Sequence, residues 1–188
     1  MRSLRFMAVL AALSVALSAG CSQQRANNPS VKGNVKDSLK QAGFNKVNVS
    51  EDRNKGVVTL KGEVATQEDK IKAEQAAQRV AGNNIVANEI LATQGDRGQA
   101  RKVSDDVDKA IQARVKEFID TEKLSKQHIG YEAKNGVLTL TGHVDSQQLR
   151  AAMEKNFATI DGVTQVINKL DLRNNHRRQT ALKDVNGR

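Results

Sequence analysis

One short segment occurs twice in this chain. Residues 56–64 read GVVTLKGEV, and residues 136–144 read GVLTLTGHV. The same offset persists beyond these segments without a gap, so that further residues match in identity or type: Gln67 with Gln147, Glu74 with Glu154, Gly82 with Gly162, Val86 with Val166, Asn88 with Asn168, and Ile90 with Leu170. Self-similarity at a fixed offset indicates a duplicated structural unit. We therefore expect two copies of one small module.

In the first module, residues 31–92, segments with the apolar spacing of a helix and segments with the alternation of a strand follow one another. Apolar side chains recur at helical spacing in residues 31–42 and 66–81, and a glycine follows each segment. Strand patterns occupy the segments between and after these helices, at residues 44–53, 57–64 and 85–92. The predicted order is helix, strand, strand, helix, strand.

The second module, residues 104–173, repeats this order. Ser104 is expected to cap a longer first helix, whose acidic first turn suits the positive end of the helix dipole. Asn135 and Gly136 form a dipeptide typical of a two-residue hairpin. Ser146 is expected to cap the second helix, and residues 163–172 are predicted to form the last strand.

These patterns predict an α+β protein with two tandem αββαβ modules, each a three-stranded sheet with two helices on one face. Residues 93–103 are expected to form a linker, and the basic tail at 174–188 lacks a sustained period and is predicted to be disordered. Polar residues alternate with apolar ones in 57–64, which indicates a sheet covered on one face only. Modules this small are marginally stable alone, so we expect packing between them or against a partner.

Residues 1–20 have the layout of a secretory signal peptide. Arg2 and Arg5 precede an apolar run at residues 6–17, and small residues follow this run. The run is shorter than the roughly 20 apolar residues that a permanent membrane-spanning helix needs. We therefore expect export of the chain and cleavage before Cys21.

Cys21 is the only cysteine, and the small residues before it resemble the lipobox of bacterial lipoproteins. This resemblance implies that Cys21 is acylated and becomes the first mature residue, with residues 21–30 as a lipidated tether. Ser22 resembles the outer-membrane sorting pattern of such lipoproteins, which implies an outer-membrane protein that faces the periplasm. The alternative is an ordinary signal peptide and a soluble periplasmic protein with a free cysteine.

The formal net charge of +9 lies mainly outside the modules. Residues 31–92 carry +2 and residues 104–173 carry −1, so the remaining excess belongs to the N-terminal segments, the linker and the tail. Aromatic residues make up 3% of the chain and tryptophan is absent. A nucleic-acid interface needs a basic face and bases need aromatic stacking partners, so we expect no nucleic-acid partner.

The repeated motif, Gly-Val-x-Thr-Leu-x-Gly-x-Val followed by a capped helix and Gly-x-x-x-Val-x-Asn-x-[Ile/Leu], resembles the BON domain. Its matching positions are Gly56, Gly62, Gly82 and Asn88 in the first module and Gly136, Gly142, Gly162 and Asn168 in the second. With the lipobox, the chain resembles dual-BON outer-membrane lipoproteins of Gram-negative bacteria. The resemblance implies a non-catalytic module that associates with phospholipid and supports envelope integrity or osmotic stress tolerance.

Catalytic and metal-binding patterns are not apparent in the residues. His128, His143 and His176 do not share metal-ligand spacing, and no acid–base constellation accompanies them. Gly56 and Gly136 fit hairpin turns with positive φ, and Gly62 and Gly142 fit a bulge or close helix packing. We expect Asn88 and Asn168 to tie a loop to the last strand. We therefore expect no enzyme, cofactor or metal site, and the sequence leaves open a small-ion sensor.

Two groups of basic residues are candidate contacts for anionic lipid. Lys109, Lys116 and Lys123 recur at heptad spacing on the expected first helix of the second module, and the tail contributes Arg177, Arg178 and Lys183. For the helix, the alternative is an ordinary solvated face. Our leading hypothesis is an envelope lipoprotein that contacts an anionic phospholipid membrane. The alternative is a periplasmic adaptor or assembly module, anchored only by its lipid, whose open sheet faces and strand edges bind envelope proteins.

Overall fold

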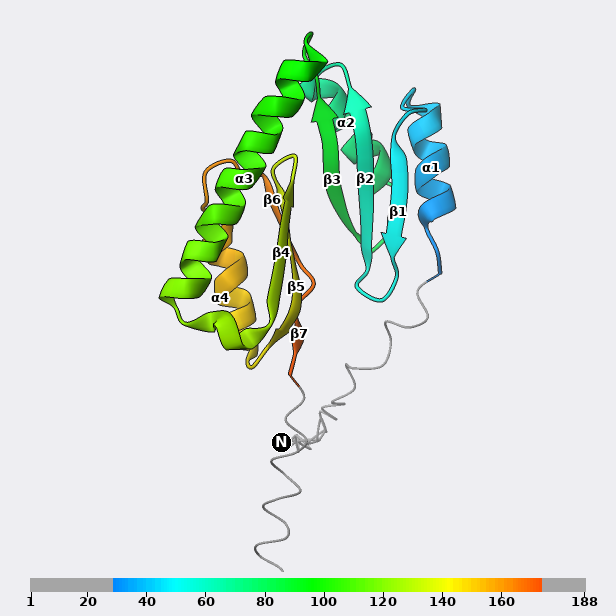
Figure 1. The fold of residues 1–188 in the computed structure, drawn as a ribbon. Helices are drawn as coiled ribbons and strands as arrows, with labels where there is room; N and C mark the ends of the chain where they lie inside the picture. Colours follow the sequence, from blue (N-terminus) through cyan, green and yellow to red (C-terminus); the bar gives the residue numbers. More distant parts are fainter. Residues whose placement is uncertain (1–28, 174–188) are drawn as a thin grey trace, which may run out of the picture.

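The computed structural model describes residues 29–173, which form two similar modules side by side (Figure 1). The first module contains a three-stranded sheet in the order β1-β2-β3, with β1 antiparallel and β3 parallel to the central β2. Its elements are α1 (Lys32–Gln41), β1 (Asn48–Asp52), β2 (Val57–Val64), α2 (Gln67–Gln78) and β3 (Ile85–Ala92). The predicted αββαβ order is confirmed.

The second module has the same order, and its last strand is divided. Both β6 and β7 pair with β5 in parallel, so together they occupy the place that β3 has in the first module. The elements are α3 (Arg97–Thr121), the 3-10 helix η2 (Leu124–Gln127), β4 (Ile129–Lys134), β5 (Val137–Val144), α4 (Gln147–Phe157), β6 (Gln165–Asn168) and β7 (Asp171–Leu172). The α+β class with two tandem modules is thus confirmed.

Each module has its own hydrophobic core between its two helices and one face of its sheet. In the first core, Ala73, Ala76 and Ala77 of α2 are buried, and these small residues let α1 approach closely. The hydroxyl of Ser38 on α1 donates to the Ala76 carbonyl at 2.8 Å. The second core has larger side chains on α4, where Phe157 meets Phe118 edge to face with ring centroids 5.1 Å apart.

Two equivalent asparagines tie the second helix of each module to its last strand. The Asn88 side chain donates to the Lys70 carbonyl and to Glu74 Oε2, both at 3.0 Å, and accepts from the Ile90 amide at 3.3 Å. Asn168 makes the same three bonds, to Arg150, Glu154 and Leu170. We expected each asparagine to connect the last strand to a loop, but each one connects the last strand to the second helix of its module.

The glycines that recur in both modules have two explanations in the structure. Gly56 and Gly136 have φ of +63° and +83° at the hairpins, which confirms the predicted turns. At Gly62, a Cβ atom would lie 2.9 Å from the Lys46 carbonyl oxygen, and at Gly142 it would overlap the carbonyl oxygen of His128. The absence of a side chain at these two glycines therefore leaves room for the backbone that enters β1 and β4. The bulge or close helix packing that we expected is not their role.

The long helix α3 begins at Arg97, and not at Ser104 as expected. The Asp96 side chain caps it by accepting from the Gly98 and Gln99 amides at 2.8 and 3.1 Å. Residues 97–103, expected in the linker, thus belong to the helix. The Ser104 hydroxyl is free to donate to Asn135 Oδ1 at 2.8 Å.

The sheet faces that the helices leave open pack against each other. Val57 and Ala87 of the first sheet form a buried cluster with Val137 and Ile167 of the second, which we call the inter-module contact. The Gln165 amide group also reaches the free edge of β3, where it donates to the Val86 carbonyl at 2.9 Å and accepts from the Asn88 amide at 3.4 Å. The modules thus cover each other's faces and part of an unpaired strand edge.

Substitution of Asn88 by alanine is expected to lower the free energy of unfolding by about 2 kcal/mol, because the buried Ile90 amide loses its acceptor. The matched substitution Asn168→Ala should cost about 1 kcal/mol, since Asn168 is only partly buried. Urea unfolding at constant slope measures both values. If Asn168→Ala lowers the free energy of unfolding as much as Asn88→Ala or more, burial does not explain the difference between the two asparagines.

Candidate functional site

Both ends of the described chain lie at the same pole of the molecule, toward the lower end of the coloured ribbon in Figure 1. At the N-terminal end, the Ser30 hydroxyl and the Val31 amide donate to the Glu51 carboxylate at 2.6 and 3.0 Å. At the C-terminal end, the Arg173 guanidinium pairs with Asp145 at 3.3 Å and donates to the Lys126 carbonyl at 3.0 Å. We call this region the chain-end pole; it comprises residues 30–32, 51–55, 126–127, 145 and 169–173.

Two ion pairs between the modules join the two sides of the chain-end pole. Lys55 pairs with Asp171, and Lys169 Nζ lies 3.2 Å from Asp52 Oδ2. The hydrogen bond from Lys55 lowers the pKa of Asp171. These pairs hold the β1–β2 turn of the first module against the last strand segment of the second.

The chain-end pole carries more basic than acidic residues. Its basic residues are Lys32, Arg53, Lys55, Lys126, Lys169 and Arg173, and its acidic residues are Glu51, Asp52, Asp145 and Asp171. Burial raises the pKa of Glu51, but hydrogen bonds from Ser30, Val31 and Lys32 outweigh this effect and lower it. The acids are thus occupied with local hydrogen bonds or ion pairs, while Lys32 and Arg53 are exposed and form no ion pair within residues 29–173.

The predicted helical stripe of lysines is not continuous. Lys109 and Lys116 are exposed on α3 and pair with Asp106 at 3.6 Å and Asp120 at 2.7 Å. The hydrogen bond to the Asp120 carboxylate raises the pKa of Lys116. The third member, Lys123, lies beyond the helix end with φ of +54°, so the expected placement of all three on one helix is wrong. The tail residues Arg177, Arg178 and Lys183, together with Cys21 and His176, lie outside the described residues.

A cleft of about 490 Å³ lies between the modules, lined by residues of α2, β3, α3 and the β4–β5 turn. Val103 and Val107 of α3 are exposed in its wall, and Lys70 of α2 extends toward the second module, where its Nζ lies 3.3 Å from the Asn135 carbonyl oxygen. Burial lowers the pKa of Lys70, although the Glu74 and Asp108 carboxylates oppose this shift. With two carboxylates near this single ammonium group, the cleft is poorly suited to an anion.

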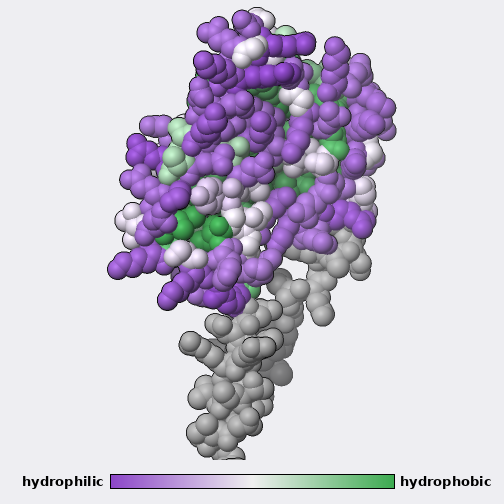
Figure 2. Space-filling view, viewed as in Figure 1, coloured by the Kyte–Doolittle hydropathy of each residue, from purple (hydrophilic) through white to green (hydrophobic). Residues whose placement is uncertain are grey.

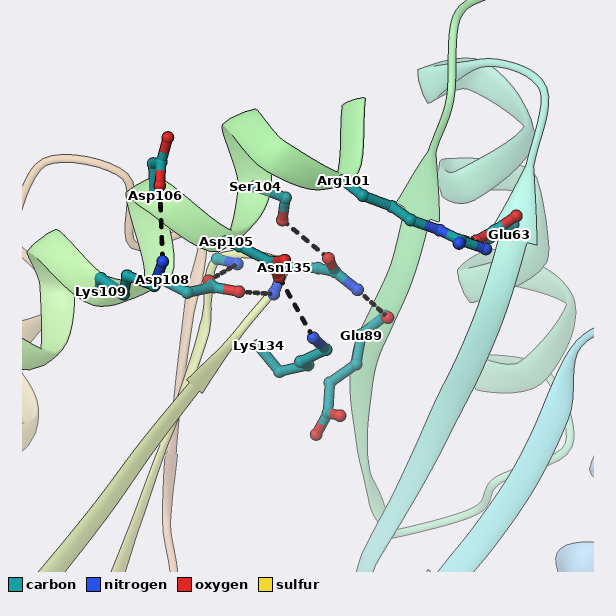
Figure 3. Close-up of polar contacts among 11 residues, drawn as sticks. Glu63, Glu89, Arg101, Ser104, Asp105, Asp106, Asp108, Lys109, Lys134 and Asn135 are labelled. Atoms are coloured by element: carbon teal, nitrogen blue, oxygen red, sulfur yellow. Dashed lines mark hydrogen bonds and ion pairs between the residues drawn. The ribbon is translucent and has the colours of Figure 1, made fainter. Parts of the chain in front are cut away.

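The buried Asp108 and the half-buried Asn135 near the cleft have structural partners (Figure 3). The Asp108 carboxylate accepts from the Asn135 and Gly136 amides at 2.8 and 3.0 Å, and so holds the β4–β5 turn. Asn135 Nδ2 donates to the Glu89 carbonyl of β3 at 2.6 Å, which connects this turn to the first module. From the sequence, we expected Asp108 among several acidic residues in the first turn of a helix. Nothing in the sequence distinguished it from its acidic neighbours.

The surface in Figure 2 is mainly hydrophilic, with separate small hydrophobic areas. Within residues 29–173, no three His, Cys, Asp or Glu side chains lie close enough together to hold a metal ion. No helix in this range combines the length and apolar character that crossing a bilayer requires.

Comparison with known proteins identifies a family and a curated relative. The family model described as BON domain matches residues 27–94 and 107–174. Osmotically-inducible protein Y of Escherichia coli (strain K12) is 29% identical over 114 residues, which cover 61% of this chain and 56% of that protein. The chain therefore spans just over half the length of this relative.

Two solved structures have a weaker similarity. CdsD, a structural protein of the type III secretion system of Chlamydia trachomatis, is 13% identical with a TM-score of 0.37, over 83% of this chain and 97% of that one. A structure of the CdsD C-terminal domain is 12% identical with a TM-score of 0.33, over 78% of this chain and 99% of that one.

Proposed function

Because this chain belongs to the BON domain family, we propose that it is a non-catalytic envelope lipoprotein, anchored through Cys21 in the outer membrane and facing the periplasm. Its modules associate with anionic phospholipid and support the envelope under osmotic stress. The name of its relative, osmotically-inducible protein Y, supports the link to osmotic stress. The observation that carries the membrane proposal is the position of both chain ends at one pole with an excess of basic residues.

The lengths of the terminal segments fit this arrangement. Cys21 precedes Pro29 by eight residues, which span at most about 28 Å, and Arg177 follows Arg173 by four residues, which span at most about 14 Å. An anchor at Cys21 and the basic tail can therefore reach the membrane from the same side of the molecule. Multiple acyl chains would supply stable anchoring, since a single chain binds only reversibly.

Electrostatics would add a second attachment at this pole. A basic residue near an anionic membrane contributes about 1 kcal/mol, and the contribution falls off within a Debye length. The tail supplies Arg177, Arg178 and Lys183, and the pole supplies the exposed Lys32 and Arg53. Arg53 also acts on Glu51 through its charge but forms no ion pair with it, whereas Lys109 and Lys116 on α3 are paired with carboxylates, which reduces their attraction for an anionic surface.

The covered sheet faces favour membrane association over the adaptor hypothesis. The adaptor hypothesis relied on open sheet faces, but Val57 and Ala87 are buried against Val137 and Ile167 of the other module. Part of the β3 edge is likewise covered by Gln165. These faces are therefore not accessible to a partner protein while the modules are packed together.

The unacylated protein, residues 22–188, should sediment with anionic vesicles at low salt and much less with zwitterionic vesicles. Replacing Arg177, Arg178 and Lys183 together by serine should weaken anionic binding on the order of a hundredfold. The matched control Lys109→Ser/Lys116→Ser/Lys123→Ser should have a far smaller effect. Equal binding to both vesicle types would exclude the lipid proposal, and a discrete crosslinked partner in intact cells would then support the adaptor.

The anchor requires a separate test in cells. Cys21→Ala removes the acylation site, so the variant is expected to leave the outer-membrane fraction and appear in the soluble periplasmic fraction or as an unprocessed precursor. Cys21→Ala combined with an ordinary cleavable signal peptide separates loss of anchoring from loss of processing. Retention of this second variant in the outer membrane at the parent level would contradict lipid anchoring.

A further inference from the structure

The inter-module contact uses equivalent positions of the two copies. Val57 matches Val137 in the repeat and Ala87 matches Ile167, and all four side chains lie in one buried cluster. Each module therefore presents the same two positions to the other. A contact built in this way has an approximate two-fold symmetry, like the isologous interface of a homodimer.

The turns at either end of the contact follow the same symmetry. The turn before β2 contacts the last strand of the second module through Lys55 and Asp171. The equivalent turn before β5 contacts the last strand of the first module, where Asn135 Nδ2 donates to the Glu89 carbonyl. Lys55 and Asn135 are themselves matching positions of the repeat. Both turns thus extend onto the last strand of the partner module, through different contacts.

The modules share no hydrophobic core besides this contact. Each has a separate core, and among the described residues the only buried cluster with members from both modules is the inter-module contact. The remaining connections are exposed or partly exposed polar contacts, including the pairs of Glu63 with Arg97 and Arg101. A module can therefore leave its partner without losing its own core.

The covalent connection between the modules is short and has an unfavourable conformation. Only residues 93–96 separate the end of β3 from the start of α3. Gln94 has φ of +38°, a region that non-glycine residues rarely occupy, and Gly95 follows with φ of +107°. The Gln94 amide donates to the Ala65 carbonyl at 2.8 Å and holds the turn against the first module. Short strained hinge loops favour exchange of segments between copies.

From these features we propose that the protein exchanges modules with a second copy of itself. In the exchanged dimer, residues 93–96 are extended, and the first module of each copy packs against the second module of the other. Every inter-module contact of the monomer is then formed twice, and Gln94 adopts an ordinary extended conformation. The exchange does not depend on lipid, but anchoring in a membrane would raise the effective concentration of one copy near another.

Complementary charge reversals test the exchange directly. One variant carries Asp52→Lys and Lys55→Asp, and the other carries Lys169→Asp and Asp171→Lys. Within each variant, like charges face each other across both inter-module ion pairs. In a mixed exchanged dimer, the two reversed modules match each other and the two unaltered modules match each other, so every pair is restored.

Each variant alone is expected to form no more dimer than the parent chain, because its like charges face each other in the closed monomer and in its own exchanged dimer alike. The two variants refolded together from urea should form much more dimer, with twice the monomer mass by light scattering. The control mixture is Lys61→Glu with Glu89→Lys, which disrupts an ion pair inside the first module, and mixing should not raise the dimer fraction above that of the parent chain. A refolded mixture of the first two variants that stays monomeric, while circular dichroism shows both folded, would overturn the proposal.

The hinge offers an independent measurement on the parent chain. Gln94→Gly removes the penalty for positive φ in the closed monomer and should weaken the dimer on the order of tenfold, whereas the β-branched Gln94→Val should strengthen it by a similar factor. Dimer dissociation constants from concentration series, after refolding, give the comparison. Identical constants for all three proteins would contradict the role of the hinge in exchange.

Discussion

The packing of one sheet face on the other determines most of what this molecule presents to its surroundings. Four apolar side chains, Val57, Ala87, Val137 and Ile167, form the buried part of this contact. Without it, each sheet would expose its second face and β3 would have an uncovered edge. Because exposed ion pairs contribute only about 0–1 kcal/mol each, the pairs around the contact orient the modules more than they stabilise them.

The same packing explains why the two ends of the described chain lie at one pole. The approximate two-fold relation places the β1–β2 turn beside the last strand segment of the second module, where Lys55 and Lys169 find their carboxylate partners. The start of α1 is bound to neighbouring Glu51. A duplicated module thereby gains a property that a single copy lacks, namely one pole from which both terminal segments leave.

Much of this fold could be predicted from the repeat alone. The constant offset between the copies, the hairpin glycines and the helical periods predict both modules and their order, because these features reflect local backbone requirements and the core face of each element. The inter-module contact could not be placed in the same way. Val57 shares its strand face with Thr59, Lys61 and Glu63, a pattern typical of a solvated face, and its burial against Val137 and Ile167 depends on the other module.

Specific polar residues were the least predictable part. Asp96 and Ser104 are both suitable helix caps, and the true start became clear only from the Asp96 bonds to Gly98 and Gln99. Gln165 matches the exposed Ile85 in the repeat, so the repeat itself gave no reason to expect its bonds to β3. Lys123 fits a heptad with Lys109 and Lys116, but the helix ends at Thr121. Such details depend on tertiary contacts and on where each helix ends.

The central claim is that sheet-to-sheet packing presents the chain-end pole to the membrane. Residues 22–188 contain no cysteine, so a single fluorescent label can be attached at Asn54→Cys, in the exposed turn of this pole, or at Asn45→Cys, exposed at the opposite end of the first module. On anionic vesicles with spin-labelled headgroups, the account predicts strong quenching of the label at position 54 and little at position 45. Equal quenching, or stronger quenching at position 45, would contradict it.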